Sequence, residues 1–295
     1  DRISFIKKII PKNKFIFVKG DILNKNLINN LIKKYKIKKI IHLAAQAGVR
    51  HSINNPRKYI DANIVGFFNI LETSRENKIS HLIYASTSSV YGSNRNFPFQ
   101  EKKSADHPIQ LYAATKRSNE IMAHAYSSMF KIPTTGLRFF TAYGPFGRPD
   151  MALYLFAKNI SENKKINVFN YGNHIRDFTY VDDIADAVVK IFKAGFKKEK
   201  KWNNKNPDIG SSSAPFTILN IGSGKKIKLM QYINLIEKEL GKKSRKKYFS
   251  LQKGDIQKTH ANINKLKSLY NFSCNTPVEI GIKKYIKWFK KYYQY

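Results

Sequence analysis

The chain has 295 residues, of which 42% are hydrophobic and 13% aromatic, and its formal net charge is +34. This length and composition are typical of a folded protein of one or two domains, and they exclude a disordered chain. No stretch approaches the roughly 18 apolar residues of a membrane span, and a single cysteine, Cys274, excludes an internal disulfide, so we expect a cytoplasmic protein without a membrane segment.

The positive charge is spread along the whole chain. Lysines occur in every region, with modest clusters at Lys197–Lys201 and Lys242–Lys247, and no nucleic-acid-binding motif accompanies them. We therefore expect no nucleic-acid partner, although the charge would assist the attraction of a phosphorylated substrate. Metal-ligand clustering is absent from the sequence, so we expect no metal.

Strand and helix patterns alternate through the first half of the chain. Short apolar runs predict strands at 15–22, 38–45, the start of 81–92 and 134–140. Apolar residues at helical spacing predict helices at 24–36, 61–77 and 111–130. This rhythm indicates an α/β fold with a parallel sheet and helices on both faces. Polar clusters follow the expected strands, where the active sites of such sheets lie: Gly20-Asp21, His42–Gln46, Ser86–Ser89 and Phe140–Tyr143.

The second half of the chain is less regular. A Gly/Pro loop at 144–151 is followed by a helix, and further elements are expected at 166–172, 176–192, 217–224, 229–240 and 277–293. We therefore expect a sheet domain at 1–143, to which 176–196 returns. A smaller α/β substrate lobe is expected at 144–175 and 197–295.

One pair of residues points to chemistry. LYAATK (111–116) places Lys116 four residues after Tyr112, so the two share a face of the expected helix. A neighbouring ammonium stabilises phenolate and would lower the tyrosine pKa toward working pH, which suits a general base acting on a sugar or alcohol hydroxyl. The pair alone is commonplace on solvated helices. STSSVYG (86–92), at the end of the preceding strand, supplies a hydroxyl that could share the proton.

ASTSSVYG followed by LYAATK resembles the extended short-chain dehydrogenase/reductase superfamily, which uses a Ser/Thr–Tyr–Lys triad with NAD. The resemblance covers nearly the whole chain. Four further segments are most similar to the UDP-glucuronate 4-epimerases: HLAAQAGVRHS (42–52), DANIVGFFNILE (61–72), TTGLRFFTAYGPFGRPDMA (134–152) and RDFTYVDDI (176–184). The implied fold is a Rossmann-type, doubly wound parallel sheet with a nucleotide-sugar lobe. The 61–77 and 111–130 helices would pair across a homodimer, although their apolar stripes fit ordinary internal packing equally well.

The resemblance also implies roles for single residues. Tyr112 would be the base, Lys116 its pKa partner and ribose ligand, and Thr87 the hydroxyl member of the triad. The implied NAD contacts are Asp21, Ile22, Leu43, Ala44, Ala45, Gln46, Ala85, Ser86, Tyr112, Lys116 and Phe140. The implied UDP-sugar contacts are Arg50, Thr87, Ser88, Ser89, Thr141, Arg148, Met151, Asn167, Val168, Phe169, Arg176 and Asp255. His42 is interpreted as a packed strand residue.

The residues after Thr87 favour epimerisation over elimination. Related sugar 4,6-dehydratases carry an acidic pair before Val-Tyr-Gly, whereas this chain has Ser88 and Ser89. Hydroxyls and backbone N–H groups at these positions can receive the C6 carboxylate of a uronic acid, with Thr141 as a third donor. The resemblance thus implies C4 epimerisation of UDP-glucuronate through a 4-keto sugar. C4 epimerisation of UDP-glucose or UDP-N-acetylglucosamine, a non-catalytic NAD-binding regulator and a polyanion-binding protein are the alternatives.

The glycine-rich dinucleotide fingerprint of this fold does not occur in the chain. It should follow the first strand, and GSGKK (222–226) lies late and lacks the spacing of a phosphate loop. The sequence opens at Asp1-Arg2 and at once enters a helix that in relatives lies after the second strand. We therefore expect that an N-terminal strand–helix–strand unit is missing from this sequence, and that the chain as given binds NAD poorly.

Overall fold

Four parallel strands form the central sheet of the computed structural model, which describes residues 2–199, 202–252 and 254–295. The strands are β1 (Lys39–His42), β2 (His81–Thr87), β3 (Thr134–Phe139) and β8 (Phe216–Ile221), in the order β1-β2-β3-β8. Their carboxyl ends meet at one edge, where Ser86, Arg138 and Asn220 stand in register on three neighbouring strands. The prediction of an α/β fold with a parallel sheet is confirmed.

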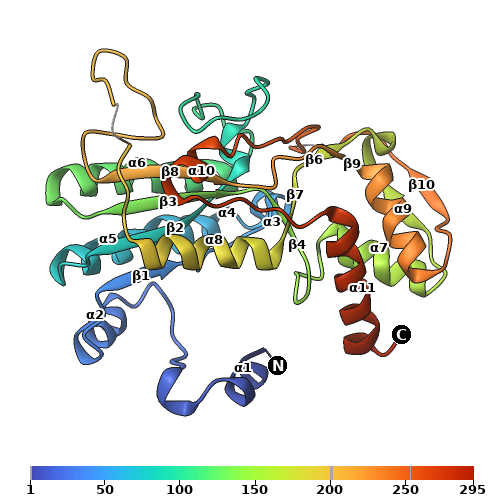
Figure 1. Ribbon diagram of the computed structural model, residues 1–295, viewed down its shortest axis with the longest axis horizontal. Coiled ribbons are helices and arrows are strands. Elements are labelled where there is room, and N and C mark those ends of the chain that lie inside the picture. Colours follow the sequence, from blue (N-terminus) through green and yellow to red (C-terminus); the bar gives the residue numbers. More distant parts are fainter. Residues whose placement is uncertain (1, 200–201, 253) are drawn as a thin grey trace.

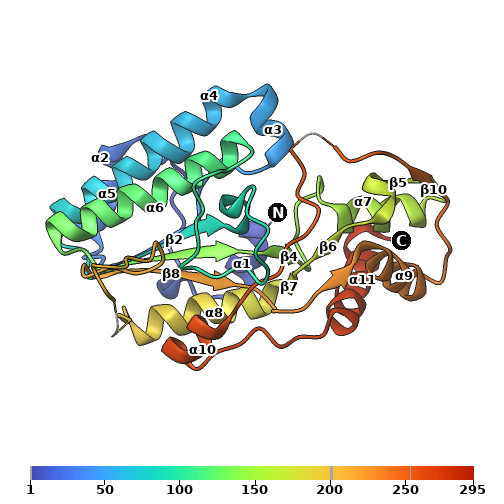
Figure 2. The ribbon, with the colours of Figure 1, turned by 90° about the horizontal axis from the view of Figure 1, so that it is seen from above.

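Helices cover both faces of the sheet (Figures 1 and 2). One layer contains α2 (Lys25–Lys34), α5 (Gly66–Glu76) and α6 (Leu111–Phe130), and the other contains α8 (Val181–Ala194) and α10 (Asn264–Tyr270). Alternation along β2 serves both layers, because Leu82 and Tyr84 pack on the first side and Ile83 on the second. In the described part of the chain, no helix has the length and apolar character needed to cross a membrane.

The expected 61–77 helix begins earlier and is not uniform. The chain forms α3 (Val49–Asn54) and α4 (Pro56–Tyr59), then the π-helical turn η2 (Ile60–Val65), and continues as α5. Asn63 lies in η2, and its side chain bonds to Gln46 and to Thr115 of α6. A π-turn of this kind commonly accompanies a functional site.

A smaller lobe packs at one end of the sheet (Figure 1). It is built from α7 (Ala152–Ser161), α9 (Leu229–Leu240), α11 (Val278–Tyr293) and the parallel pair β5 (Ile166–Val168) and β10 (Lys246–Tyr248). Its core is rich in aromatic rings, among them Phe178 and Tyr232, which stack with their centroids 3.9 Å apart.

Two short strand pairs lie between the sheet and the lobe. The parallel pair joins β4 (Thr141–Tyr143) to β7 (Phe178–Tyr180), and the antiparallel pair joins β6 (Ile175–Arg176) to β9 (Ile227–Lys228). The chain passes from β6 into β7 and then into α8, so Arg176 lies where the lobe meets the sheet domain.

Two expectations from the sequence were wrong. Residues 15–20 are not a strand: they follow α1 (Arg2–Ile9) and η1 (Lys12–Lys14) as irregular backbone, because no described segment forms a ladder with them. The range 197–295 is not wholly part of the lobe, since β8 pairs with β3 as a strand of the central sheet. Its residues 216–221 are all buried, which is the environment of a central strand.

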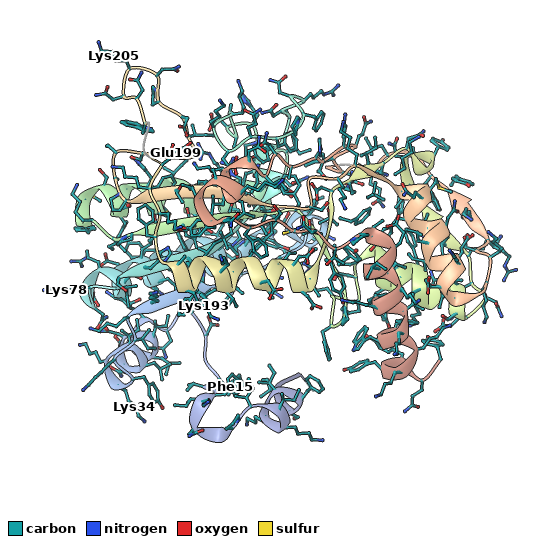
Figure 3. All side chains as sticks on the ribbon, in the orientation of Figure 1. Phe15, Lys34, Lys78, Lys193, Glu199 and Lys205 are labelled. Carbon is teal, nitrogen blue, oxygen red and sulfur yellow. The ribbon has the colours of Figure 1, made fainter. Side chains whose placement is uncertain are left out.

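Lysine side chains point outward from many different elements (Figure 3). Lys34, Lys78, Lys193 and Lys205 are all exposed and come from different segments of the chain. The positive charge is therefore contributed by several segments and not by a single element.

Candidate active site

The catalytic side chains predicted from LYAATK and STSSVYG meet at the end of β2. Lys116 Nζ donates to the carbonyl oxygen of Ala85 at 2.9 Å, and the Thr87 side chain lies close enough to Tyr112 to act on its pKa. The Thr87 hydroxyl also accepts from the backbone N–H of Ser89 at 3.2 Å. Tyr112 and Lys116 occupy the first turns of α6, so the helix presents both to the strand.

The pKa of Tyr112 differs from our expectation, and that of Lys116 is shifted as well. Burial raises the pKa of Tyr112, outweighing the lowering that comes from the Thr87 side chain and from the charge of Arg148. Burial also lowers the pKa of Lys116 to about 8, against the opposing effect of the Glu120 carboxylate. The expected lowering of the tyrosine pKa was therefore wrong for the protein without ligands, because desolvation disfavours phenolate more than its neighbours stabilise it.

Three small hydroxyl side chains follow one another at this strand end. Thr87 closes β2, and Ser88 and Ser89 begin the 3₁₀ turn η3 (Ser88–Tyr91). Thr87 and Ser88 are buried and Ser89 is half-buried. Thr141 lies at the start of β4, where its backbone N–H donates to the backbone carbonyl oxygen of Asp177. The turn thus offers hydroxyl and N–H donors and carries no carboxylate.

Tyr59 is a part of the site that the sequence analysis missed. Its hydroxyl donates to the carbonyl oxygens of Ala47 and Gly48, at 3.0 and 2.6 Å, and its ring stands edge-on to Tyr112 with centroids 6.2 Å apart. Gly48 has a φ of 110°, and a Cβ there would lie 3.1 Å from the guanidinium of Arg148. No local motif marks Tyr59, whose role depends on a turn eleven residues away.

Two sequence-predicted residues, one of them at the junction of the sheet domain and the lobe, form an ion pair. Arg176 donates to Asp255 at 3.1 Å, and His174 lies 3.3 Å from the other oxygen of that carboxylate. Burial acts to raise the pKa of Asp255, but His174 and Arg176 together hold it below its usual range. Arg148 is likewise paired with a carboxylate, that of Asp150.

Asp177 organises the glycine-rich loop at 222–226. One carboxylate oxygen accepts from the N–H and hydroxyl of Ser223, both at 2.8 Å, and the other accepts from the N–H groups of Gly224 and Ala261, at 3.0 and 3.1 Å. Asp177 is fully buried. The loop therefore closes around a carboxylate of the chain itself, in agreement with our exclusion of a phosphate loop here.

Several predicted NAD contacts lie around the first strand. Asp21 is exposed in a turn and accepts from the N–H of Leu23, while Ile22 packs beside Gly66 of α5. The segment 43–46 leaves β1, with Leu43 exposed and Gln46 held through both backbone groups by Asn63. His42 is buried against Phe67, as expected of a packed strand residue.

The donor set fits a nicotinamide nucleotide at this edge. Lys116 is only 2% exposed, yet among the described residues its ammonium has one hydrogen-bond acceptor, Ala85. An ammonium carries three N–H groups, so two remain for ribose hydroxyls. Within the same described residues, no group of three or more His, Cys, Asp or Glu could hold a metal ion.

Other predicted contacts are less open. The Phe140 ring is buried among Tyr91, Phe99 and Ala261, and Val168 is fully buried in the lobe. Asn167 is exposed, and Phe169 packs on Phe249, with the ring centroids 5.3 Å apart. Met151 is 38% exposed before α7. Arg50 belongs to α3, but its side chain lies outside the described residues.

Comparison with known proteins agrees with this geometry. Residues 4–203 match the family described as "NAD dependent epimerase/dehydratase family". Protein CapI of Staphylococcus aureus is 49% identical over 287 residues, which is 97% of this chain and 86% of the relative. Because the matches extend over most of both sequences, the chain belongs to the NAD-dependent epimerase/dehydratase family.

Two solved structures share the fold. The UDP-glucuronic acid 4-epimerase of Bacillus cereus, in complex with UDP-glucuronic acid and NAD, has a TM-score of 0.83 and 31% identity, covering 99% of this chain and 87% of its own. The UDP-glucose 4-epimerase of Thermotoga maritima, with UDP-glucose, has a TM-score of 0.84 and 25% identity, covering 97% and 88%. The Rossmann-like fold, NAD as cofactor and an NAD-dependent nucleotide-sugar epimerase are therefore confirmed predictions.

Proposed function

We propose that the protein interconverts UDP-glucuronate and UDP-galacturonate by inverting carbon C4 of the sugar. The observation that carries this assignment is the run of hydroxyl side chains Thr87, Ser88 and Ser89 at the end of β2, with no carboxylate among them. A carboxylate here would repel a uronic acid. Hydroxyl and N–H donors can instead bind its C6 carboxylate. The match to the UDP-glucuronic acid 4-epimerase of Bacillus cereus supports this choice.

Tyr112 is the group that moves the proton. It takes the proton of the C4 hydroxyl and later returns it, while Thr87, which lies beside it, orients the phenol. Bound NAD supplies a reversible hydride acceptor, and its oxidised ring adds a positive charge that favours phenolate. Lys116 holds the ribose side of the cofactor site. The 4-keto sugar formed from glucuronate is a β-keto acid, so Ser88, Ser89 and Thr141 must also hold its carboxylate away from the geometry of decarboxylation.

The lobe supplies the cations that bind the diphosphate. Arg176 and Arg148 each carry a planar guanidinium suited to bidentate contact with phosphate, and each is paired with a carboxylate in the protein without ligands. Asp255 can accept from ribose hydroxyls, and 167–169 would lie beside the uracil. Binding then requires these charged side chains to exchange partners.

The helices α5 and α6 form the dimer contact that we propose. Phe68 on α5 and Ile121 and Phe130 on α6 are exposed by 44, 56 and 44%. These apolar side chains belong to the two adjacent helices that the resemblance singled out. We accordingly propose that the protein is a homodimer in the cytoplasm. Sedimentation of the full-length protein would measure its oligomeric state.

The decisive test follows the anomeric proton signals of UDP-glucuronate by NMR. The full-length protein, supplied with NAD, should produce UDP-galacturonate and approach the same equilibrium from either sugar. UDP-xylose or a persistent 4-keto sugar would contradict the proposal, because either product means that the intermediate is diverted.

A neutral UDP-sugar is the second candidate substrate. The fold match to the UDP-glucose 4-epimerase of Thermotoga maritima favours it, since the proton-transfer groups would be the same for both sugars. Conversion of UDP-glucose or UDP-N-acetylglucosamine, with UDP-glucuronate left unchanged, would select this alternative.

Ser89→Glu separates the two substrates. The new carboxylate would stand in the turn after Thr87, so we expect activity on UDP-glucuronate to fall by about a hundredfold while binding of NAD is kept. Ser93→Glu, outside the turn, is the control and should leave activity within twofold. Unchanged turnover by Ser89→Glu would remove the carboxylate assignment.

A further inference from the structure

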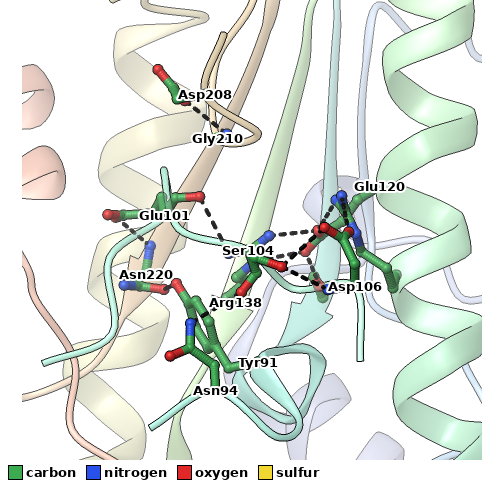
Figure 4. A network of polar contacts seen from close by, with 12 residues as sticks. Tyr91, Asn94, Glu101, Ser104, Asp106, Glu120, Arg138, Asp208, Gly210 and Asn220 are labelled. Carbon is green, nitrogen blue, oxygen red and sulfur yellow. Dashed lines mark hydrogen bonds and ion pairs between the residues drawn. The ribbon is translucent and has the colours of Figure 1, made fainter. Parts of the chain in front are cut away.

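A buried ion pair joins α6, the helix that carries Tyr112 and Lys116, to strand β3, and it takes no part in the proposed proton transfer. Glu120 on α6 and Arg138 on β3 are both fully buried, and Arg138 donates to both carboxylate oxygens, at 2.9 and 2.8 Å (Figure 4). Arg117 adds a third donor at 3.1 Å. Desolvating two charges is expensive, so a buried pair of this kind is weak evidence for a gain in stability.

Glu120 also bonds to the strand that carries the active site. The Ser86 hydroxyl donates to Glu120 at 2.6 Å. Ser86 stands between Ala85 and Thr87, the residues that contact Lys116 and Tyr112. Ala85 and Ser86 therefore each make one hydrogen bond to α6, and Thr87 lies beside Tyr112. The bond of Ser86 ends on the buried carboxylate of Glu120.

The helix positions match this arrangement. Residues 112, 116 and 120 are four apart, so they follow one another along one face of α6. Of the three contacts, two connect groups that face the proposed substrate and cofactor. The third is the Ser86–Glu120 bond, and its carboxylate is held by Arg138, whose position in β3 is in register with Ser86.

The anchor extends across the sheet. The Arg138 guanidinium lies 4.7 Å from the centre of the Tyr91 ring, and the Tyr91 hydroxyl donates to Asn220 on β8 at 2.7 Å (Figure 4). Asn220 in turn donates to the carbonyl oxygen of Phe99. Arg138 is thus held from two sides, which fixes the place that Glu120 can occupy.

We propose that Glu120 is a positioning residue: through Ser86 and Arg138 it fixes the end of β2 against the helix that carries the proton-transfer pair. The inference rests on the proposed function, because the pair it positions is the one that moves the C4 proton. Loss of this bond should let the strand end and the helix separate by a fraction of an ångström, which lowers kcat more than it weakens binding.

The first test uses Ser86→Ala, which removes one hydroxyl and leaves the ion pair intact. In the full-length protein with NAD we expect kcat to fall about tenfold, with KM for the UDP-sugar within twofold and NAD content unchanged. Ser127→Ala is the matched control: it is also a buried serine, on the same helix, and its hydroxyl has no hydrogen-bond partner among the described residues. That variant should keep its kcat.

Three results of this test would overturn the inference. The first is an unchanged kcat in Ser86→Ala. The second is a loss of bound NAD with full turnover per bound NAD, which would make Ser86 a cofactor contact, as the resemblance implied. Equal falls in kcat in Ser86→Ala and Ser127→Ala would indicate a general loss of packing, and they would also overturn the inference.

The second test concerns the charge of Glu120. Its carboxylate opposes the lowering of the Lys116 pKa. In Glu120→Gln the pKa of Lys116 should fall further, so the alkaline limb of the kcat profile moves to lower pH. Glu120→Asp keeps the charge and should leave that limb in place, although kcat falls because the shorter side chain reaches Ser86 poorly. A kcat in Glu120→Asp equal to that of wild type contradicts the inference.

Amide hydrogen exchange provides a measurement that needs no turnover. Ser86→Ala should speed exchange in peptides covering 84–92 and 111–118, and Ser127→Ala should not. If the wild-type protein converts no UDP-sugar, the proposed function fails alone, and these rates still decide whether Glu120 holds the strand to the helix. Equal rates in wild type and Ser86→Ala overturn it.

Discussion

The two sides of the candidate site are organised in opposite ways. On the side of β2 and α6, Lys116 is bonded to the strand at Ala85, and Tyr112 lies beside Thr87. On the side of the lobe, Arg148 and Arg176 are bonded to carboxylates. Under the proposed function, the first side would need little rearrangement for reaction, whereas the second would have to exchange partners when a diphosphate binds. Changes on the first side should therefore affect kcat, and changes on the second should affect KM.

The largest expected effect comes from Tyr112→Phe. Removal of the phenol hydroxyl leaves no group at this place to take the C4 proton, so we expect kcat to fall by about a thousandfold or more. The comparison requires that KM changes little. Tyr126→Phe is the matched control, since its hydroxyl lies on the same helix and bonds to Glu72 away from the site. Residual activity above about a tenth would show that another group moves the proton.

Arg176→Met should act on binding. Loss of the guanidinium removes the bidentate donor to the diphosphate, so KM for the UDP-sugar should rise about thirtyfold while kcat stays within threefold. Arg57→Met is the control, because that side chain is 85% exposed and pairs with Asp61 on the helix surface. A fall in kcat with constant KM would break the division between the two sides.

Lys116→Met tests how far the catalytic side is strained. Because burial lowers the folded-state pKa of Lys116 to about 8, the protonated lysine destabilises the folded protein at neutral pH. We expect the variant to be inactive but more stable than wild type by about 2 kcal/mol at pH 7, after allowing for the lost bond to Ala85. Denaturant titrations at several pH values measure the difference.

The stability difference between Lys116→Met and wild type should change in size with pH. It should be largest below pH 8, shrink as the folded lysine loses its proton and vanish above about pH 10.5, the range of an unfolded lysine. Lys190→Met, an exposed substitution on α8, should show no such trend. A gain in stability that does not depend on pH would mean that packing, and not charge, is responsible.

Asp150→Asn should have the smallest effect. Arg148 is 42% exposed and Asp150 60% exposed, so their pair contributes about 0.5 kcal/mol. Freed from this partner, Arg148 should meet the substrate more readily, and KM should fall about twofold. Asp61→Asn, which breaks another exposed pair with arginine, should leave KM unchanged. A rise in KM after Asp150→Asn would mean that the carboxylate helps to place Arg148.

The difference between the two sides also decides what the sequence could predict. Tyr112, Lys116 and Thr87 are recognisable because their chemistry lies in two short stretches, each at the boundary of one element. Strands β1, β2 and β3 were likewise predicted from local apolar runs. The strand expected at 15–22 failed because pairing with a neighbour, and not local pattern, decides whether an extended segment becomes a strand.

The missed residues share a dependence on distant contacts. Tyr59 acts through a turn at 47–48, and Glu120 acts through Arg138, eighteen residues later on another element. The expected lowering of the Tyr112 pKa was wrong for a related reason: the helical spacing of the pair was read correctly, but burial was not visible in the sequence. Polar side chains within apolar helices and strands indicated buried hydrogen bonds, but the sequence did not indicate which groups they bond to.

Arg176 and Asp177 are neighbours in the chain, yet they pair with different groups. Arg176 is bonded to Asp255 and is our proposed donor to a substrate phosphate, whereas Asp177 is itself the anion around which the loop at 222–226 closes. A tethered carboxylate has a very high effective concentration, so a free phosphate competes poorly for the N–H groups of Ser223 and Gly224. The loop has the glycine-rich composition of a phosphate-binding loop, but the anion that it binds is the Asp177 carboxylate of the same chain.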